Sequence, residues 1–322
     1  MARSSLRPKG DTGQSGAAAG ASLSTPGAPA TATLSAYCMI ATYPDLGPVE
    51  LADRAVLEPL LRALPDGISE FSFAGIFCFR EQHGYRLTRV DDTIVLAGLD
   101  KGHPFFVAPF GLPPPKLRDQ LFARLGEAKL LTQAQAEDLS RAGLVTWEDR
   151  DNFDYLYRRE ALADLAGRAL QRKRNLVNHF LKRHAYRAYP LTPEGVAIAL
   201  RILERWREGA PDQADYAPAR EAITHALEWG LRGSLYDVDG SPAGYALGEY
   251  AAGGSTFVVH YEKAIPEMKG LYQVINMDFA RSLPASCTTL NREQDLGDPG
   301  LRQAKLTYRP MAFLKKFRAK PA

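Results

Sequence analysis

The order of secondary-structure patterns between residues 160 and 290 constrains the fold of this chain most. Apolar residues recur there with helical spacing in three stretches, and three strand-like runs follow, separated by the turn sequences Asp239-Gly240 and Gly253-Gly254. The expected helices span 160–184, 193–208, 218–230 and 267–283, and the expected strands span 233–238, 244–250, 255–261 and 287–290. Short consecutive strands joined by tight turns form an antiparallel meander, so this part of the chain is predicted to be an α+β unit.

A second α+β unit is predicted before it, from residue 37 to about residue 143. Residues 51–64 have helical spacing and end at the turn sequence Pro65-Asp66-Gly67. The expected strands span 71–73, 76–79, 85–88 and 93–97, and the expected helices span 117–125 and 132–142. A chain of 322 residues is long enough for two such units. We therefore expect an N-terminal half at 36–146 and a C-terminal half at 147–322.

Residues 1–35 differ in composition from the rest of the chain. They are mostly Ala, Gly, Ser, Thr and Pro, and no aromatic residue occurs before Tyr37. Such a segment cannot bury enough apolar surface to offset the entropy of ordering. It is predicted to be a disordered tail.

Cysteines and apolar runs limit the other classes of protein. Cys38, Cys78 and Cys287 lie far apart and form no CxxC pair, so neither a disulfide framework nor a metal site is predicted. The longest strongly apolar run, residues 71–79, is about half as long as a membrane-spanning helix needs. We expect no transmembrane segment and a cytoplasmic protein, with a peripheral position at the inner face of the membrane as the open alternative.

Charge is unevenly distributed along the chain. The 40 basic and 37 acidic residues give a net charge of only +3, which by itself does not indicate a polyanion partner. Residues 158–187, however, contain nine basic residues and two acidic ones, and residues 301–320 contain seven basic residues and no acidic one. The remainder of the chain is therefore acidic, and both basic segments lie in the C-terminal half.

The first basic segment contains a predicted helix over residues 167–184. At 100° per residue most of its polar side chains fall on one face, whereas Lys173 lies on the apolar side. A lysine there either extends its amine to solvent or meets an anion. The candidate ligands for a phosphate or a tRNA backbone are Arg168, Arg172, Lys173, Arg174 and Asn175. A solvated basic face is an equally good interpretation.

His260-Tyr261-Glu262-Lys263 ends the last meander strand, directly before a predicted helix. Free backbone donors of a strand end would meet a helix N-terminus there, so the junction suits reacting groups. Glu262 is a candidate general base and Lys263 its charge partner. A plain ion pair between Glu262 and Lys263, and a histidine satisfied within the core at His260, are the alternatives.

Residues 291–297 (NREQDLG) form a predicted turn after the last strand. A turn with Gly297 and an aspartate exposes polar side chains at a sheet end, where they can line a cleft. The candidates are Asn291, Arg292 and Asp295 in the turn, followed by Arg302, Lys305 and Tyr308. Local caps and ion pairs within an ordinary turn are the alternative.

Several of these strings together resemble a known family. They are Asp154-Tyr155-Leu156-Tyr157, Leu165-Ala166-Gly167-Arg168, Lys173-Arg174-Asn175, His260-Tyr261-Glu262-Lys263, Gly270-Leu271-Tyr272, and residues 291–297 and 300–310 (GLRQAKLTYRP). The chain resembles the bacterial DUF2156 family from about residue 36 to 318. That family is related to the C-terminal catalytic domain of phosphatidylglycerol lysyltransferase.

The resemblance implies an α+β fold of two tandem GNAT-like (acyl-CoA N-acyltransferase-like) halves that face a shared cleft, as in the Fem-type peptidyltransferases. Each half would hold a mixed, mostly antiparallel sheet with flanking helices. The predicted order of helices, meander, helix and strand agrees with a GNAT half, although many α+β folds share it.

The resemblance further implies an acyltransferase that moves an aminoacyl group from aminoacyl-tRNA to a lipid or another small amine or hydroxyl acceptor. The acceptor could be an anionic lipid at the membrane surface, and no cofactor is expected. Glu262 and Asp295 are the predicted catalytic residues, and the remaining candidates would bind substrate. Two alternatives stay open: an acyl-CoA-dependent N-acyltransferase, and a non-enzymatic scaffold that binds an anionic ligand or membrane surface. No Gly-rich phosphate loop follows residues 255–261, which weakens the acyl-CoA alternative.

Overall fold

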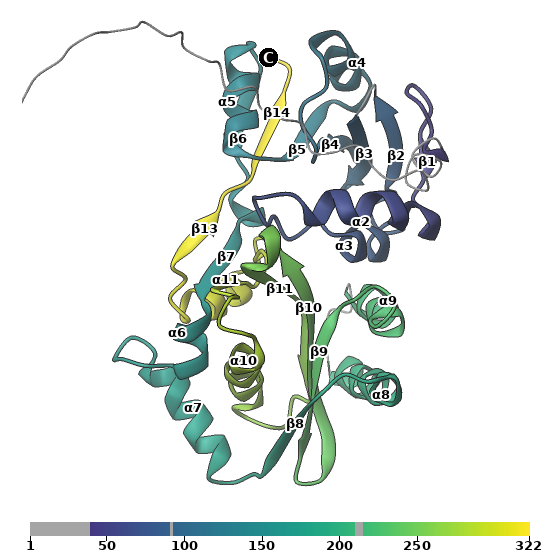
Figure 1. Cartoon of the computed structure of the whole chain (residues 1–322). Coiled ribbons are helices and arrows are strands. Elements are labelled where there is room, and N and C mark those ends of the chain that lie inside the picture. Colours follow the sequence, from purple (N-terminus) through teal and green to yellow (C-terminus); the bar gives the residue numbers. More distant parts are fainter. Residues whose placement is uncertain (1–38, 91–92, 210–214) are drawn as a thin grey trace, which may run out of the picture.

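Two mixed sheets with flanking helices make up the protein in the computed structural model, which describes residues 39–90, 93–209 and 215–322 (Figure 1). The predicted tail at 1–35 lies outside the described residues. The strands form no closed barrel in this part of the chain. The prediction of an α+β fold in two halves, each with a mixed, mostly antiparallel sheet and flanking helices, is confirmed. No helix of the described residues is long and apolar enough to cross a membrane.

The first sheet has the strand order β1-β2-β3-β4-β5-β14-β6. Its strands are β1 Gly47–Pro48, β2 Arg86–Val90, β3 Thr93–Asp100, β4 His103–Val107, β5 Glu127–Leu131, β6 Val145–Glu148 and β14 Phe317–Lys320. Neighbouring strands are antiparallel except β4 and β5. The helices of this half are η1 Leu51–Asp53, α2 Arg54–Arg62, α3 Phe73–Cys78, α4 Pro115–Leu125 and α5 Gln133–Arg141.

The second sheet has the order β13-β7-β12-β11-β10-β9-β8. Its strands are β7 Asp154–Arg158, β8 Tyr186–Pro190, β9 Arg232–Val238, β10 Ser241–Ala251, β11 Thr256–Ala264, β12 Thr289–Asn291 and β13 Ala312–Leu314. Only β11 and β12 are parallel. The helical segments are η2 Arg150–Asn152, α6 Arg159–Asp164, α7 Gln171–Leu181, α8 Pro193–Gly209, α9 Tyr216–His225, η3 Ala252–Gly254, α10 Leu271–Ser282 and α11 Pro299–Leu306.

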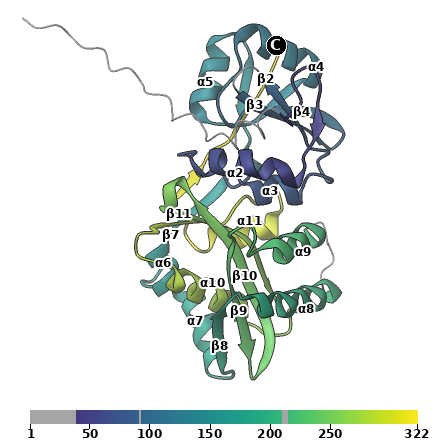
Figure 2. The same ribbon diagram turned by 45° about the vertical axis from the view of Figure 1, so that its right-hand side comes forward.

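Helices cover both faces of the second sheet. In Figure 1, α8 and α9 lie on one face, and α6, α7 and α10 lie on the other. The apolar side chains of α8 and α9 share one core with α2 and α3 of the first half. Figure 2 shows α2 and α3 between the two sheets, so the halves are joined through a continuous buried cluster.

The C-terminal strand ties the halves together a second time. After β13, the chain returns to the first sheet, where β14 lies between β5 and β6. Strand β14 is yellow in Figure 1. Arg318 on this strand pairs with Asp149, Glu127 and Asp100. The predicted division at residues 146 and 147 falls within β6.

Residues 71–79 contain helix α3, at Phe73–Cys78, and no strand, so the two strands predicted there are wrong. The Ser72 hydroxyl caps the helix by accepting a hydrogen bond from the Gly75 N–H at 2.9 Å. Phe73 and Phe77 pack against the Trp229 ring from α9's C-terminal extension, with centroids 5.8 and 5.5 Å away. An apolar run this short fits either a strand or a buried helix, and the tertiary environment decides.

The single helix predicted at 160–184 is also wrong, because the chain breaks into α6 and α7. Leu165 and Gly167 adopt φ values of +50° and +78°, which end α6. The Arg174 guanidinium donates to the carbonyl oxygens of Leu165 and Gly167 and stabilises the break. Arg168 therefore lies in the turn before α7 and not on a helix face.

Candidate functional site

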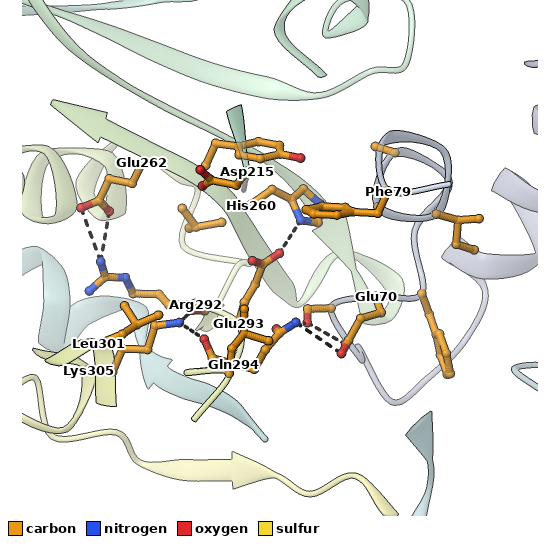
Figure 3. Close-up of a pocket in the computed structure, with 18 of the residues that line it drawn as sticks. Glu70, Phe79, Asp215, His260, Glu262, Arg292, Glu293, Gln294, Leu301 and Lys305 are labelled. Carbon is orange, nitrogen blue, oxygen red and sulfur yellow. Dashed lines mark hydrogen bonds and ion pairs between the residues drawn. The ribbon is translucent and has the colours of Figure 1, made fainter. Parts of the chain in front are cut away.

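A cavity of about 660 Å³ lies between the two halves. The first half contributes the segment after α2, helix α3, and residues of β3, β4 and β5. The second half contributes one residue of α7, the last part of β11, the start of α10, the turn after β12, and α11. Figure 3 shows Glu262, Arg292 and Lys305 at one end and Phe79 and Glu70 at the other. Both halves are thus needed to form the cavity.

In the second half, strands β11 and β12 separate where the cavity begins. β11 pairs with β12 only from Thr256↔Thr289 to Val258↔Asn291, and β11 then continues to Ala264 paired with β10 alone. Beyond that point only side chains bridge the gap. His260 on β11 bonds Glu293, and Glu262 pairs with Arg292, whose Nη2 lies 3.3 Å from Glu262 Oε2. The split therefore presents charged side chains to the cavity.

His260 is held between two carboxylates. Its Nδ1 lies 2.7 Å from Glu293 Oε1 and its Nε2 lies 3.1 Å from Glu249 Oε1, and the imidazole is almost completely buried. Burial alone would lower the pKa of His260, but the hydrogen bonds to Glu249 and Glu293 outweigh it and raise that pKa to about 10. His260 is therefore an imidazolium at neutral pH whose two N–H groups are already used.

A cationic cluster forms at the α7 and α11 side of the cavity. The Lys173 ammonium lies 4.0 Å from the centre of the Tyr308 ring, and the Arg292 guanidinium lies 5.0 Å from the same ring. Burial, with a smaller contribution from Arg292, lowers the pKa of Lys173. Among the described residues, no carboxylate lies within 4.0 Å of the Lys173 ammonium. This amine is the cation of the cluster that lacks a counter-charge there.

Lys305 on α11 lies beneath this cluster. Its ammonium donates to the carbonyl oxygen of Arg292 at 2.7 Å and to that of Gln294. Burial lowers the pKa of Lys305 to about 8. An ammonium with two carbonyl acceptors has one N–H left, and a pKa of this size lets it give up a proton near neutral pH.

Lys263 lines the cavity from β11 but is already paired. Its ammonium contacts Asp215, and it lies 3.6 Å from the centre of the Trp206 ring on α8. Burial lowers the pKa of Lys263. Its partner is Asp215 and not Glu262, which pairs with Arg292 instead, so the ion pair considered between Glu262 and Lys263 does not form.

Asp295 and Arg302 lie outside the cavity lining. The fully buried Asp295 carboxylate accepts hydrogen bonds from Tyr155 at 2.5 Å, Arg302 at 2.8 and 2.9 Å, Arg150 at 3.2 Å and the Gly297 N–H at 3.0 Å. Burial would raise the pKa of Asp295, but the hydrogen bonds from Arg302 and Tyr155 hold it well below its usual range. Such a carboxylate stabilises the turn and is a poor proton acceptor.

Asn291 also lies behind the cavity wall. Its amide donates to the Gly67 carbonyl at 3.0 Å and to Asp154 at 2.9 Å, and its oxygen accepts from the Glu293 N–H at 2.8 Å. Glu293 has a φ of +56°, so the turn is held in a conformation that few non-glycine residues adopt. Asn291 thereby fixes the backbone from which Arg292 and Glu293 enter the cavity.

The remaining candidates on the first basic segment are dispersed. Arg168, Arg172 and Asn175 are exposed and do not line the cavity, and Arg174 is used in the α6–α7 break. Lys173 alone from this segment reaches the cavity. The structure thus brings together Lys173, His260, Glu262, Lys263, Arg292, Lys305 and Tyr308.

Several cavity residues were missed by the sequence analysis. Glu293 and Gln294 belong to the predicted turn, and their position directly after the candidate Arg292 could have suggested them. Glu70 and Asp215 carry no local signal. Packing of the first half against the second places Glu70 at the cavity, and the fold of the second half brings Asp215 to Lys263.

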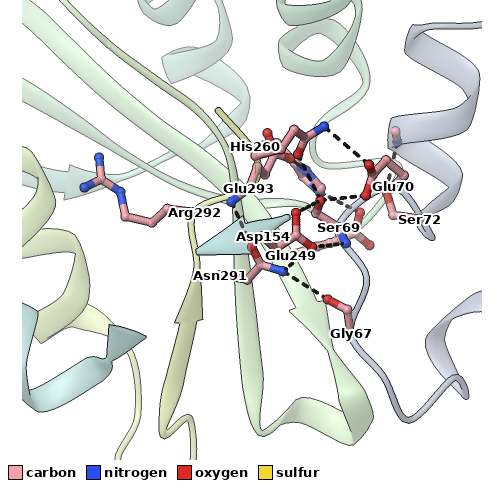
Figure 4. A network of polar contacts seen from close by, with 12 residues as sticks. Gly67, Ser69, Glu70, Ser72, Asp154, Glu249, His260, Asn291, Arg292 and Glu293 are labelled. Carbon is pink, nitrogen blue, oxygen red and sulfur yellow. Dashed lines mark hydrogen bonds and ion pairs between the residues drawn. The ribbon is translucent and has the colours of Figure 1, made fainter. Parts of the chain in front are cut away.

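A buried polar network behind the cavity also escaped prediction (Figure 4). The fully buried Lys316 ammonium contacts Asp154 at 2.7 Å and also Glu70, and Ser69 donates to Asp154 through its N–H at 2.9 Å and its hydroxyl at 2.7 Å. Asn291 reaches the same aspartate. The network connects the first half, β7, the turn after β12 and the C-terminal segment.

Sequence comparison decides the family. Residues 61–320 match the phosphatidylglycerol lysyltransferase C-terminal family, also known as DUF2156. The chain belongs to this family. It is thereby placed among transferases, as the resemblance of its motifs implied. None of the curated proteins matches the chain.

Solved structures of similar chains agree with the fold. A conserved protein of unknown function from Bacteroides thetaiotaomicron is 26% identical with a TM-score of 0.77, over 86% of this chain and 99% of that one. The C-terminal domain (DUF2156) of a putative lysylphosphatidylglycerol synthetase from Agrobacterium fabrum is 12% identical with a TM-score of 0.57, over 82% and 91%. FemX is 12% identical with a TM-score of 0.54, over 81% and 94%.

Proposed function

We propose that the protein is an aminoacyltransferase that moves an aminoacyl group from aminoacyl-tRNA to an amine or hydroxyl acceptor in the shared cavity. Membership of the lysyltransferase family supports the reaction class. The observation that carries the proposal is Lys173, a half-buried ammonium at the cavity edge without a carboxylate partner among the described residues. A cation kept in this state is suited to an anionic ligand such as a phosphate of the donor.

Neighbouring charges extend this anion site outward. Arg168 and Arg172 are exposed next to Lys173 along the chain, and Arg292 lies beside Lys173 at the Tyr308 ring. Exposed arginines steer a polyanion, whereas the half-buried lysine makes a defined contact. The tRNA backbone would therefore lie over the start of α7, with its aminoacyl end in the cavity.

The reaction needs modest chemical help. The acceptor nitrogen or oxygen forms a bond to the ester carbonyl carbon, loses a proton, and the bond from that carbon to the ribose oxygen breaks. Glu262 would take the acceptor proton, and Arg292, 3.3 Å from it, would stabilise the oxyanion. Lys305, with its pKa of about 8, would return a proton to the ribose oxygen. Positioning by both halves supplies the rest.

Binding of aminoacyl-tRNA tests the proposal. Lys173→Gln is expected to weaken retention of aminoacyl-tRNA on filters and to reduce the slope of log affinity against log salt by about 1, because one phosphate contact is lost. Lys182→Gln removes the same charge from the exposed end of α7 and should change the slope much less. Equal slopes for the parent and both variants would remove tRNA from the proposal.

The acyl-CoA alternative has less support. In a GNAT half the coenzyme A pyrophosphate would dock at the N-terminus of α10, yet this end is packed against α7. Gly270 has a φ of +99°, and a β-carbon placed on it would lie 2.7 Å from the Leu176 carbonyl oxygen. Coenzyme A should therefore leave the melting temperature unchanged, since only a ligand of the native state raises it. Retained tRNA binding without any turnover would instead favour the non-enzymatic scaffold.

A further inference from the structure

Both sheets open toward the same cavity at their parallel strand pair. In the first half β4 and β5 pair only at Phe105↔Glu127 and Phe106↔Ala128. Beyond these pairs, Val107 on one side and Leu130 on the other line the cavity. The split between β11 and β12 opens into it from the second half. The two splits are equivalent in topology but opposite in chemistry, because charged side chains line the second and apolar side chains line the first.

The apolar part of the cavity, here termed the apolar chamber, is built by the first half. Its walls are Ala74, Ile76, Phe79, Leu96, Val107 and Leu130. Five of these side chains are buried, between 1% and 7% exposed, and Phe79 is partly exposed. An interior space with such walls accepts an apolar group that leaves water completely.

Leu130 occupies its place in the chamber at a cost in backbone conformation. Its φ is +54°, and the pairing of β5 with β14 shifts register beside it, between Phe317 and Ala319. Leucine rarely adopts positive φ, and bulges of this kind redirect a side chain next to functional sites. The bulge keeps a leucine as a chamber wall.

Carboxylates stand between the chamber and the charged end. Glu293 is 28% exposed and Glu70 is 20% exposed, and Gln294 donates from its amide to Glu70 at 3.4 Å. Figure 3 shows Glu293 and Gln294 between Glu70 and the Arg292 end of the cavity. Glu293 shares the His260 cation with Glu249, and Glu70 shares the Lys316 cation with Asp154. An ammonium group placed there would therefore meet more carboxylates than cations, with the apolar chamber behind it.

We propose that the apolar chamber binds the acceptor, and that this acceptor is a small primary amine with one compact apolar group the size of a leucine or phenylalanine side chain. The inference rests on the proposed function, because it assigns the second substrate of that reaction. A pocket of this volume suits one drug-sized molecule, and the aminoacyl end of the donor must share it. A phospholipid with two long acyl chains would not fit inside.

A series of n-alkylamines from ethylamine to dodecylamine, with phenethylamine, tests the chamber. Dissociation constants are measured for the full chain from the rise in melting temperature with amine concentration. Affinity should increase roughly tenfold or more along the series and then fall once the chamber is full. Ala74→Leu, which fills the chamber, should shift the optimum to shorter amines, and Leu130→Ala, which enlarges it, should shift the optimum to longer ones.

Matched controls separate this effect from general changes in stability. Ala142→Leu adds the same bulk at an exposed position after α5 and should leave the optimum unchanged. Each variant is judged by the amine chain length that binds most tightly, and not by its melting temperature alone. A variant that is destabilised but still folded therefore remains informative. An optimum that is the same in Ala74→Leu, Leu130→Ala and the parent would overturn the proposal, as would the absence of stabilisation by every amine.

Vesicles of phosphatidylglycerol distinguish the lipid alternative. Co-sedimentation with these vesicles that is lost in Ala74→Leu, together with no response to short amines, would replace the compact acceptor with a lipid. The tRNA-binding test and the amine series are separate measurements. If Lys173→Gln does not change tRNA binding, the proposed donor is wrong, but the amine optimum can still shift in Ala74→Leu and Leu130→Ala. The two proposals can therefore fail independently.

Discussion

At the scale of single residues, the imidazolium of His260 provides a pH-dependent test of the site. The folded protein raises the pKa of His260 to about 10, above the roughly 6.5 of an unfolded chain. Its stabilisation is therefore complete below about pH 6.5 and is lost as the pH rises through 10. His260→Gln should lower the free energy of unfolding by about 3 kcal/mol at pH 6, because Glu249 and Glu293 lose their shared partner.

Urea unfolding at pH 6, 8 and 10 measures this difference. The gap between parent and His260→Gln should narrow steadily toward pH 10, whereas the exposed His103→Gln should show no such gap. A gap that stays constant with pH would mean that His260 is neutral in the folded protein.

The two carboxylates predicted to be catalytic should differ in what their loss affects. Asp295→Asn should lower the free energy of unfolding by about 3 kcal/mol, because Arg302 and Arg150 lose their buried partner, and should leave ligand binding in the cavity nearly unchanged. Glu262→Gln changes a cavity residue and should abolish transfer of the aminoacyl group while the folded protein persists. Urea unfolding and single-turnover transfer assays on both variants separate the roles. Loss of transfer with unchanged stability in Asp295→Asn would instead support a catalytic aspartate.

At the scale of elements, the cap of α3 connects the local sequence to the chamber. Ser72→Ala removes the hydroxyl that accepts from the Gly75 N–H and should cost about 1 kcal/mol of unfolding free energy. Thr132→Ala removes an equivalent cap from α5, which does not line the cavity, and should cost a similar amount. Only Ser72→Ala should weaken phenethylamine binding, because α3 supplies chamber walls. Equal phenethylamine binding in both variants would show that the cap does not position the chamber.

The elements also show how far the sequence predicts this fold. Strong periodic signals with clear turns, such as those of β9 and β10 or of α4 and α5, are confirmed to within a few residues. The run at 71–79 was misassigned because Phe73 and Phe77 meet Trp229, which lies some 150 residues later in the chain. The break between α6 and α7 depends on Leu165 at positive φ, which no propensity favours. Long-range packing and strained backbone are invisible to local pattern.

The same limit applies to the site. Glu262, Arg292 and Lys305 could be predicted because each lies in a motif at a strand end or turn. Glu70 and the apolar chamber could not be predicted, because the first half contributes them across the interface. Asp215 could not be predicted either, because only the fold of the second half brings it to Lys263. Asp295 was chosen for its position in a polar turn, but the hydrogen bonds that occupy it come from Tyr155, Arg150 and Arg302. Burial and partner identity, which separate a structural carboxylate from a reactive one, are tertiary properties.

At the scale of the whole molecule, Lys316 holds the two halves in register around the cavity. It arrives from the segment between β13 and β14, and its buried ammonium meets Glu70 of the first half and Asp154 of β7. Replacement of Lys316 by methionine leaves the Glu70 and Asp154 carboxylates without this buried cation. Lys316→Met should therefore lower the free energy of unfolding by about 3 to 5 kcal/mol.

Lys315→Met is the matched control one residue earlier. Lys315 is half exposed and pairs with Glu148 at the surface, where solvent screens the pair, so its loss should cost at most about 0.5 kcal/mol. Urea unfolding followed by tryptophan fluorescence reports on both halves, since Trp147 lies in the first sheet and Trp206 and Trp229 pack beside the second. Because the halves share a core and the strand β14, parent and variants should unfold in one transition. If Lys316→Met unfolds in two separated transitions and the parent unfolds in one, this lysine couples the unfolding of the two halves. If Lys316→Met is as stable as Lys315→Met, Lys316 has no role in holding the cavity together.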